Sequence, residues 1–299
     1  MEISSTLEQT KTAQAVPQKN SRIVIQGVRG AFHEIAARKF FGENIKIVPA
    51  LSFAELFEKM EAGGTADAAI MAIENSIAGS ILRNYHLLQH SDLTITGEVY
   101  LRIEQHLMAL PGVDISQLKE VQSHPMALAQ CALFFKKHPH IKLTESADTA
   151  ESAARIQQEN LWDVGAVGSE LAAGAYGLDI IVRCIETNHR NFTRFLALEP
   201  KDSAVANPLA NKASVSFSTS HEPGSLSRIL SMLASQGVNL TKIQSVPILG
   251  KPWQYLFFVD FIAENKNALQ STLECLKEMA LQTTVLGTYK SDNWTTNNE

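Results

Sequence analysis

The chain has 299 residues, of which 45 % are hydrophobic, so it can form about two domains of roughly 150 residues and is neither globally disordered nor fibrous. Its 26 Lys and Arg residues and 31 Asp and Glu residues give a formal charge of −5, and no basic cluster suggests a nucleic-acid partner. No apolar run approaches the roughly 20 residues that span a bilayer, and residues 1–20 lack the apolar centre of a signal peptide. We expect a cytoplasmic protein with a small-molecule ligand and no nucleic-acid or membrane partner.

From Ser21 onward, short apolar runs alternate with helical patterns, as in α/β folds. Residues 1–20 are polar and aperiodic, and we expect a disordered tail there. A helix is expected to begin at the capping-box pattern Ser52–Glu55 and to end near Gly63. The other elements predicted for this first lobe are strands at Arg22–Gln26, Ile45–Val48 and Ala68–Ile73 and a helix at Phe32–Phe41.

The middle of the chain repeats this alternation and predicts a second α/β lobe. Its expected strands are Leu118–Gln122, Ile141–Leu143 and Val164–Val167, and its expected helices are Met126–Lys137 and Asp148–Glu159. Further strands are predicted at Ile180–Cys184 and Arg194–Leu198, and we assign residues 180–199 to the first lobe. The lobes then comprise residues 21–100 with 180–199, and residues 101–179.

A polar segment with prolines at 200–211 indicates a linker. The order of elements after it is βαββαβ, a ferredoxin-like arrangement that we assign to residues 212–291, followed by a tail at 292–299. The expected strands are Ser214–Ser218, Asn239–Pro247, Tyr255–Ile262 and Thr284–Tyr289, with helices around Leu226–Leu233 and Leu269–Leu276.

Three cysteines, Cys131, Cys184 and Cys275, lie far apart without the paired spacing of a zinc site or a disulfide framework. We therefore expect reduced thiols and no metal.

Polar side chains follow two of the predicted strands at the edge where α/β sheets bind ligands. Asn75 and Ser76 follow the strand ending at Ile73, and His124 holds the equivalent place in the second lobe, with Gln130 about a turn further on. Asn75 and Ser76 are candidates for binding a carboxylate, and the alternative is that they only cap the following helix. For His124 the alternative is a structural histidine. The turn that contains Gly30 is a weaker candidate, since a plain strand-to-helix turn has the same pattern.

The segment 188–195 crowds two amides, a hydroxyl and two guanidinium groups just before a strand. Arginine suits bidentate carboxylate binding, and the Thr193 hydroxyl can donate to a departing oxygen. The alternative is an exposed turn with solvated arginines.

These motifs, in this order, resemble those of the prephenate dehydratase family from about Arg22 to Tyr289. The family's Glu-Asn-Ser…Gly segment is similar to Glu74–Gly79, and its Ser-His-Pro…Gln-Cys segment to Ser123–Cys131. Its Thr-Arg-Phe signature, the most specific of the three, is similar to Thr193–Phe195. Where the family usually has small hydroxyl residues beside an aromatic, this chain has Ala31 and His33.

The resemblance implies an α/β catalytic domain at 21–199 with two lobes like a periplasmic binding protein, and an ACT regulatory domain at 212–291. It also implies decarboxylative dehydration of prephenate to phenylpyruvate, with no cofactor. Thr193 is expected to donate to the leaving oxygen and Arg194 to anchor a carboxylate, with Glu74 or His124 as alternative proton donors. The other expected substrate-binding residues are Gly30, Asn75, Ser76, Gly79, Gln130 and Phe195.

The resemblance further implies that L-phenylalanine acts as an allosteric effector on a homodimer or homotetramer. The expected effector-binding residues are Glu222, Pro223, Gly224, Ser225 and Leu226 of one subunit and Asn239, Leu240, Thr241, Gln244 and Ser245 of its neighbour. Gln244 and Val246 depart from the family's Glu-Ser-Arg-Pro segment. Two alternatives stay open: an arogenate dehydratase, and a non-catalytic sensor of aromatic amino acids.

Overall fold

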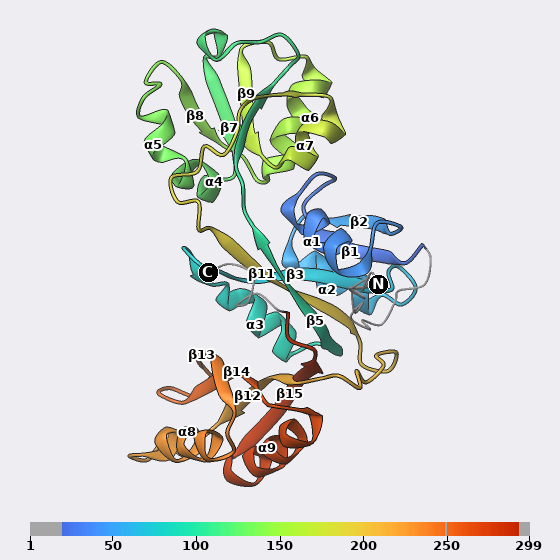
Figure 1. Ribbon diagram of the computed structural model, residues 1–299, viewed down its shortest axis with the longest axis vertical. Coiled ribbons are helices and arrows are strands. Elements are labelled where there is room, and N and C mark those ends of the chain that lie inside the picture. Colours follow the sequence, from blue (N-terminus) through green and yellow to red (C-terminus); the bar gives the residue numbers. More distant parts are fainter. Residues whose placement is uncertain (1–19, 249, 293–299) are drawn as a thin grey trace, which may run out of the picture.

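The computed structural model describes residues 20–248 and 250–292, which form three parts stacked along the long axis of the molecule (Figure 1). The second lobe lies at the top, the first lobe in the middle and the C-terminal domain at the bottom. The expected tails, 1–20 and 292–299, lie outside the described residues except for residues 20 and 292.

The first lobe is built on a sheet with the strand order β2-β1-β3-β11-β5, with the short β4 paired to β3. β1, β2 and β3 are parallel, whereas β11 is antiparallel to both of its neighbours. Its strands are β1 (Arg22–Gln26), β2 (Lys46–Ala50), β3 (Ala68–Asn75), β4 (Gly79–Ser80), β5 (Leu93–Arg102) and β11 (Phe192–Pro200), and its helices are α1 (Phe32–Phe41), α2 (Phe53–Glu61) and α3 (Leu82–Gln89).

Local signals explain most of these elements. β3 is buried at six consecutive residues because it lies between two strands with helices over it, as its continuous apolar run predicts. The Ser52 side chain caps α2 by accepting from Glu55 N–H, while Glu55 Oε2 accepts from Leu51 N–H instead of completing the expected box at Ser52. β5 has no counterpart among the predicted elements, although its apolar residues alternate like those of a strand.

The second lobe contains a sheet with the strand order β10-β6-β9-β7-β8. Its strands are β6 (His106–Ala109), β7 (Glu120–Ser123), β8 (Lys142–Glu145), β9 (Val164–Gly168) and β10 (Asp179–Val182), and its helices are η1 (Ile115–Gln117), α4 (Pro125–Gln130), α5 (Ala132–Phe135), α6 (Thr149–Glu159) and α7 (Glu170–Tyr176). The single helix expected at Met126–Lys137 is wrong in detail, because the backbone leaves helical geometry at Cys131 and separates α4 from α5.

The assignment of residues 180–199 to the first lobe needs correction. β10 pairs antiparallel with β6 and so belongs to the second sheet, and only the segment that ends in β11 returns to the first lobe. Two crossings, a short one from β5 to β6 and a longer loop from β10 to β11, therefore connect the lobes (Figure 1). One continuous apolar cluster extends from Ile23 and Phe195 of the first lobe to Leu107 and Val167 of the second.

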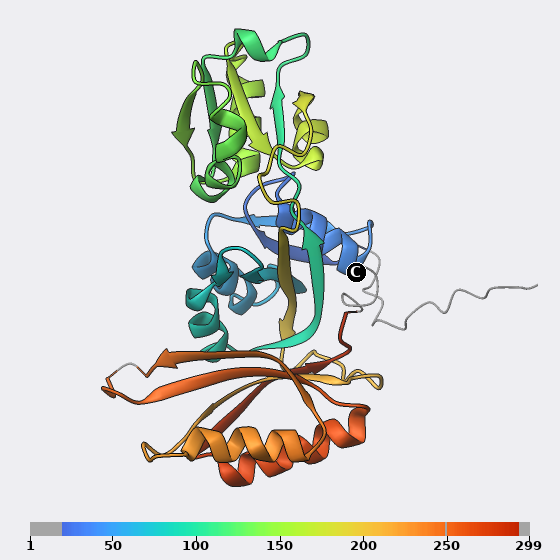
Figure 2. The same ribbon diagram turned by 60° about the vertical axis from the view of Figure 1, so that its left-hand side comes forward.

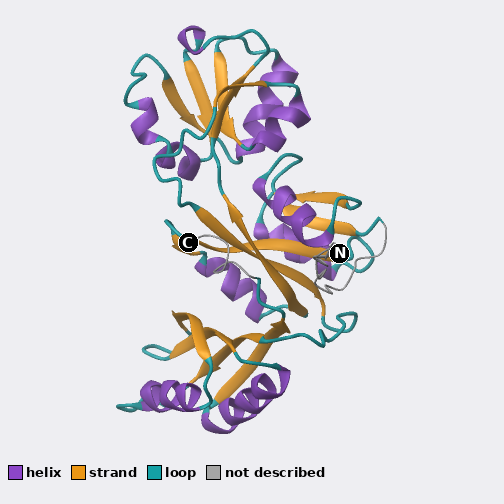
Figure 3. Cartoon of the chain, viewed as in Figure 1, coloured by secondary structure: helices purple, strands orange, loops and turns teal. Residues whose placement is uncertain are grey.

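The C-terminal domain has the expected order βαββαβ and a sheet with the strand order β13-β14-β12-β15. Its elements are β12 (Lys212–Ser218), α8 (Ser225–Ser235), β13 (Asn239–Pro247), β14 (Tyr255–Ile262), α9 (Lys266–Met279) and β15 (Gln282–Tyr289). The sheet faces the first lobe, and both helices cover its outer face (Figures 2 and 3). Phe258, Leu286 and Tyr289 of this sheet share one apolar cluster with Leu88 and Ile95 of the first lobe.

No helix among residues 20–248 and 250–292 is long and apolar enough to cross a membrane.

One close approach between the C-terminal domain and the first lobe requires a glycine. A Cβ on Gly287 would lie 2.2 Å from the Ile95 carbonyl oxygen and 2.6 Å from Ile95 Cβ. We predict that Gly287→Ala lowers the free energy of unfolding by about 1–3 kcal/mol, the usual cost of overpacking, in chemical denaturation.

The matched control is Gly174→Ala in α7, where an added Cβ meets nothing within 4 Å. This substitution should be neutral or stabilising by about 0.5–1 kcal/mol, because alanine favours helix more than glycine. Equal effects of the two substitutions would contradict the close interdomain contact.

Candidate active site

A cavity of about 390 Å³ lies between the two lobes. Asn75 and Thr193 line it from the first lobe, and His124 and Gln130 line it from the second. The sequence patterns had placed these four residues at strand ends and in helix starts, and the fold brings them to one cleft. Apolar side chains complete the wall, among them Phe32, Phe53, Ile81, Ile103 and Met126.

Asn75 and Thr193 are directly opposite each other on the antiparallel strands β3 and β11. Asn75 Nδ2 donates to Thr193 Oγ1 at 3.0 Å and to Asn191 Oδ1 at 2.8 Å. The other end of the Asn75 amide, Oδ1, accepts from the backbone N–H groups of Ile77 and Ala78 at 3.0 and 2.9 Å. Because Thr193 Oγ1 accepts from Asn75, its own proton is available for a ligand in the cleft.

The polar residues of the second lobe are oriented by similar bonds. Gln130 Oε1 accepts from Asn191 Nδ2 at 3.0 Å, which directs the Gln130 NH₂ group elsewhere as a donor. His124 Nδ1 accepts from Met126 N–H at 3.2 Å at the start of α4, so a neutral His124 ring carries its proton on Nε2. His124 therefore caps α4 and also lines the cleft.

His33 was not among the site residues expected from the sequence, but it lines the cavity. Its Nε2 accepts the backbone N–H of Ala72 at 3.3 Å, beyond the point where β1 stops pairing with β3. Its ring also stands edge-on to Phe195, with 5.0 Å between centroids. Burial lowers the pKa of His33 to about 3, so the ring is neutral at pH 7 and its proton lies on Nδ1. The departure from the family's hydroxyl residue at this position was the available signal.

Asp148 is a second cleft residue that the sequence indicated only as a helix cap. Its Oδ1 accepts from the N–H groups of Ala150 and Glu151 at 2.8 and 3.1 Å, and burial raises the pKa of its carboxyl. A Cβ on Gly27 would lie 2.8 Å from Asp148 Oδ2. The φ of +98° at Gly27 also favours glycine at this position. This turn of the first lobe therefore contacts the start of α6 across the cleft.

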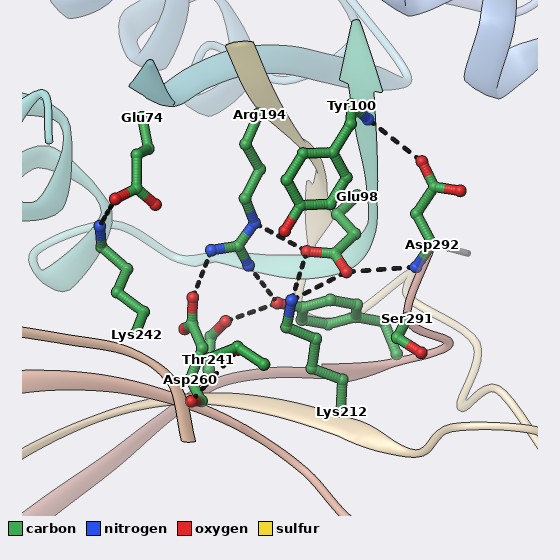
Figure 4. A network of polar contacts seen from close by, with 12 residues as sticks. Glu74, Glu98, Tyr100, Arg194, Lys212, Thr241, Lys242, Asp260, Ser291 and Asp292 are labelled. Atoms are coloured by element: carbon green, nitrogen blue, oxygen red, sulfur yellow. Dashed lines mark hydrogen bonds and ion pairs between the residues drawn. The ribbon is translucent and has the colours of Figure 1, made fainter. Parts of the chain in front are cut away.

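The expectation that Arg194 anchors a substrate carboxylate is wrong for this structure. Arg194 is 4 % exposed and points away from the cleft, where its guanidinium binds Glu98, Asp260 and Tyr289 (Figure 4). Glu74, expected in the substrate site, also faces the C-terminal domain and pairs with Lys242 at 2.7 Å. Successive residues of a strand point to opposite faces, so the neighbours of Thr193 and Asn75 cannot share their cleft.

Four other expected substrate ligands shape or support the cleft. Ser76 Oγ donates to Arg190 O at 3.1 Å and accepts from Phe192 N–H at 2.9 Å, which ties the two site loops together. Gly79 ends the turn after Asn75 with a φ of +80°. Phe195 is buried behind His33. The carbonyl of Gly30 accepts from Ser169 Oγ of the second lobe at 2.6 Å.

A second cavity of about 390 Å³ lies in the C-terminal domain. Four of the expected effector-binding residues line it, Glu222, Pro223, Ser225 and Leu226, and Gly224 lies between them as the N-cap of α8. Trp253 and Tyr255 contribute aromatic surface. The remaining expected residues, Asn239, Leu240, Thr241, Gln244 and Ser245, lie on the edge strand β13 and do not line this cavity within one subunit.

Among the described residues, no group of three or more His, Cys, Asp or Glu side chains is placed to hold a metal ion.

Comparisons with known protein families and with known sequences identify relatives that share one family name. A family model described as prephenate dehydratase matches residues 23–203. Over 283 residues the chain is 41 % identical to arogenate dehydratase/prephenate dehydratase 2, chloroplastic, from Arabidopsis thaliana, covering 91 % of this chain and 73 % of that protein.

Two solved structures share the fold over most of both chains. One is the prephenate dehydratase from Arthrobacter aurescens in complex with L-Phe, with a TM-score of 0.80, 28 % identity and 90 % of each chain covered. The other is GqqA, titled a novel type of quorum quenching acylase, with a TM-score of 0.82, 28 % identity, and 91 % of this chain and 99 % of that chain covered.

The neutral state of His33 predicts a pH dependence of stability. With a pKa of about 3 in the fold and about 6.5 when unfolded, His33 binds more protons in the unfolded chain between these values. The stability advantage of the wild type over His33→Gln should therefore decline as pH falls below about 6, by up to roughly 1.4 kcal/mol per pH unit. Denaturant unfolding at pH 7, 6 and 5 measures it.

The variant His140→Gln, at an exposed position of the second lobe, controls for the loss of an imidazole elsewhere. Parallel pH profiles of wild type and His33→Gln would contradict the assignment of His33 as a buried neutral ring.

Proposed function

This chain belongs to the prephenate dehydratase family, and on that premise we propose that it converts prephenate to phenylpyruvate, water and carbon dioxide in the cleft between its lobes. The ring carboxylate leaves as CO₂, and the electron pair of its C–C bond enters the ring. The C4–O bond breaks as the ring becomes aromatic, and the departing hydroxide takes up one proton to form water. The protein has to hold the dicarboxylate in one pose and to stabilise the leaving oxygen.

The observation that carries this proposal is the pair Asn75 and Thr193. The Asn75 amide, fixed by two backbone N–H groups, donates to Thr193 Oγ1 and so aims the Thr193 proton into the cleft. A preorganised donor of this kind stabilises negative charge that develops on the leaving oxygen. A threonine hydroxyl is a weak acid, so its part is orientation and hydrogen bonding rather than full proton transfer.

The remaining donors suit the substrate's two carboxylates. His33 Nδ1–H and the Gln130 NH₂ group are neutral donors on the cleft wall, and His124 Nε2 is a further polar group there. Phe32 and Ile103 offer apolar surface for the ring. No Lys or Arg of the described part of the chain lines this cavity. A carboxylate held by neutral donors in an apolar-walled site loses more hydration than the CO₂ formed from it, which favours decarboxylation.

Arogenate is the alternative substrate, because it undergoes the same elimination with an amino group in place of the keto group. The Arabidopsis relative is named for both activities. Purified protein incubated with each substrate, followed by assay of phenylpyruvate and phenylalanine, separates the two. Binding of both without turnover would instead favour the non-catalytic sensor.

We predict that Thr193→Ala lowers kcat by about 100-fold or more, the usual loss for one transition-state donor, with little change in thermal unfolding. Thr193→Ser keeps the hydroxyl and its bond from Asn75, and is the matched control that should retain most activity. Wild-type turnover by a folded Thr193→Ala protein would contradict the role of Thr193.

For regulation, we propose that the C-terminal domain is an ACT domain that binds L-phenylalanine in a homodimer or homotetramer. Four of the ten residues expected for such a site line the cavity beside α8, and β13 is an edge strand that a second copy could cover. The Arthrobacter aurescens prephenate dehydratase has been solved in complex with L-Phe. An effector changes activity only if it binds one quaternary state better than another.

Trp253 provides a direct signal for this site, since its side chain is 75 % exposed and lines the cavity. We predict that L-phenylalanine changes the tryptophan fluorescence of the wild type, lowers its activity, and shifts its sedimentation coefficient over the same concentration range. Trp253→Phe should lose the fluorescence change while keeping the inhibition. If millimolar phenylalanine alters none of these quantities, the domain only holds subunits together.

A further inference from the structure

A buried network of charges connects the catalytic strands to the C-terminal domain (Figure 4). Arg194 lies at its centre, with Nε at 2.7 Å from Glu98 Oε2, Nη2 at 2.9 Å from Tyr289 Oη, and Nη1 on Asp260. Lys212 Nζ lies 2.8 Å from Glu98 Oε2. Two cations and two anions therefore balance in a space closed to solvent, each of them at most 7 % exposed at its side chain.

Three contacts of the network cross between the two parts of the molecule: Arg194 to Asp260, Arg194 to Tyr289, and Lys212 to Glu98. Arg194 and Glu98 belong to β11 and β5 of the first lobe, whereas Lys212, Asp260 and Tyr289 belong to β12, β14 and β15 of the C-terminal domain. Burial opposes the charge on Arg194, but Asp260, Tyr289 and Glu98 outweigh it and raise the pKa of the guanidinium. Arg194 in turn lowers the pKa of the Asp260 carboxyl, against the effect of burial, so both partners of this pair stay charged at physiological pH and hold one defined arrangement of the two domains.

A second tie lies on the neighbouring strand. Glu74 Oε1 pairs with Lys242 Nζ of β13 at 2.7 Å, and Lys242 also donates to Ser80 Oγ at 2.7 Å. Lys242 is held over the ring of Tyr85, 5.4 Å from its centroid. The C-terminal domain thus contacts both strands of the catalytic pair.

The register of these strands places the two ties next to the catalytic groups. Thr193 pairs with Asn75, and the next pair along the ladder is Arg194 with Glu74. Directly opposed residues of an antiparallel pair share a face, and successive pairs face opposite ways. One pair therefore faces the cleft, and its neighbour faces the C-terminal domain.

From this register we propose that Arg194 is a positioning residue, which transmits the docking of the C-terminal domain to Thr193 and Asn75. In an arrangement in which Asp260 and Tyr289 withdraw, Arg194 loses two of its three partners, and β11 shifts with it because a buried guanidinium does not stay unpaired. This inference rests on the proposed function, and it assigns regulation of that function to a particular contact.

The test uses variants in the C-terminal domain, remote from the substrate. Asp260→Asn removes one charge of the network without changing its shape, and Tyr289→Phe removes only a hydroxyl, which keeps the test available if Asp260→Asn fails to fold. Both should lower kcat with KM within about twofold, Asp260→Asn by about tenfold, because a misplacement of about 1 Å at a catalytic group can cost up to about 100-fold. Lys277→Gln, which removes an exposed charge on α9, is the matched control and should behave as wild type.

Hydrogen exchange supplies a readout independent of activity. In Asp260→Asn the amides of β3 and β11 should exchange faster than in wild type, while those of β7 in the second lobe, which does not touch the network, keep their rates. A variant that is merely less stable would accelerate both sets. If the wild type lacks dehydratase activity but Asp260→Asn still shows this local change in exchange, the proposed function fails and the coupling stands.

Arg194→Lys separates positioning from substrate binding. Positioning predicts a lower kcat, as in Asp260→Asn, and no further loss when the two substitutions are combined, since both break one network. A rise in KM of about tenfold or more in Arg194→Lys, with wild-type kinetics and exchange in Asp260→Asn and Tyr289→Phe, would overturn the proposal and return Arg194 to the substrate site.

Discussion

The alternation of side chains along β3 and β11 is the constraint on which the site depends. Two strands at the centre of the first lobe carry the cleft residues Asn75 and Thr193 on one face and the interdomain residues Glu74 and Arg194 on the other. A shift of register by one residue would exchange these sets and bury a guanidinium in the cleft. The buried apolar residues of β3 that precede Glu74 fix the pairing of Phe195–Leu198, and after one register shift the pairs Arg194–Glu74 and Thr193–Asn75 end the ladder.

The interface between the first lobe and the C-terminal domain combines an apolar cluster with a charged centre. The apolar cluster stabilises docking, and the charged centre selects one arrangement of the domains. Leu286 and Phe258 pack against Leu88 and Ile95 and supply the burial that favours docking. The ion pairs around Arg194 add little net stability, because desolvation offsets most of their attraction. They do make other arrangements costly, since any slide of the sheets leaves a charge without its partner. Close packing alone, as at Gly287, would discriminate less strongly against small displacements of one domain relative to the other.

Much of the fold could be predicted from periodicity, and the failures have physical causes. α1, β13 and β14 have the predicted bounds, because each has an unbroken pattern with clear turn residues at its ends. β10 went to the wrong sheet, since an apolar run does not say which of two sheets will accept it. Arg194 was misassigned because motif crowding identified the right segment but not the face of each residue. His33 was missed as a site residue, since the only signal for it was the departure from the family's hydroxyl residue at this position.

The sharing of the Arg194 network between domains also constrains how such a chain can change over generations. Loss of Asp260 removes one of the carboxylates that pair with the buried guanidinium of Arg194 on β11, so a substitution in the C-terminal domain also affects the first lobe. Such epistasis ties the two halves into one heritable unit. Exchange of the C-terminal domain with that of a distant relative would succeed only where the incoming domain brings its own carboxylate and phenol to Arg194. Recombination inside β12, which carries Lys212, would be poorly tolerated for the same reason.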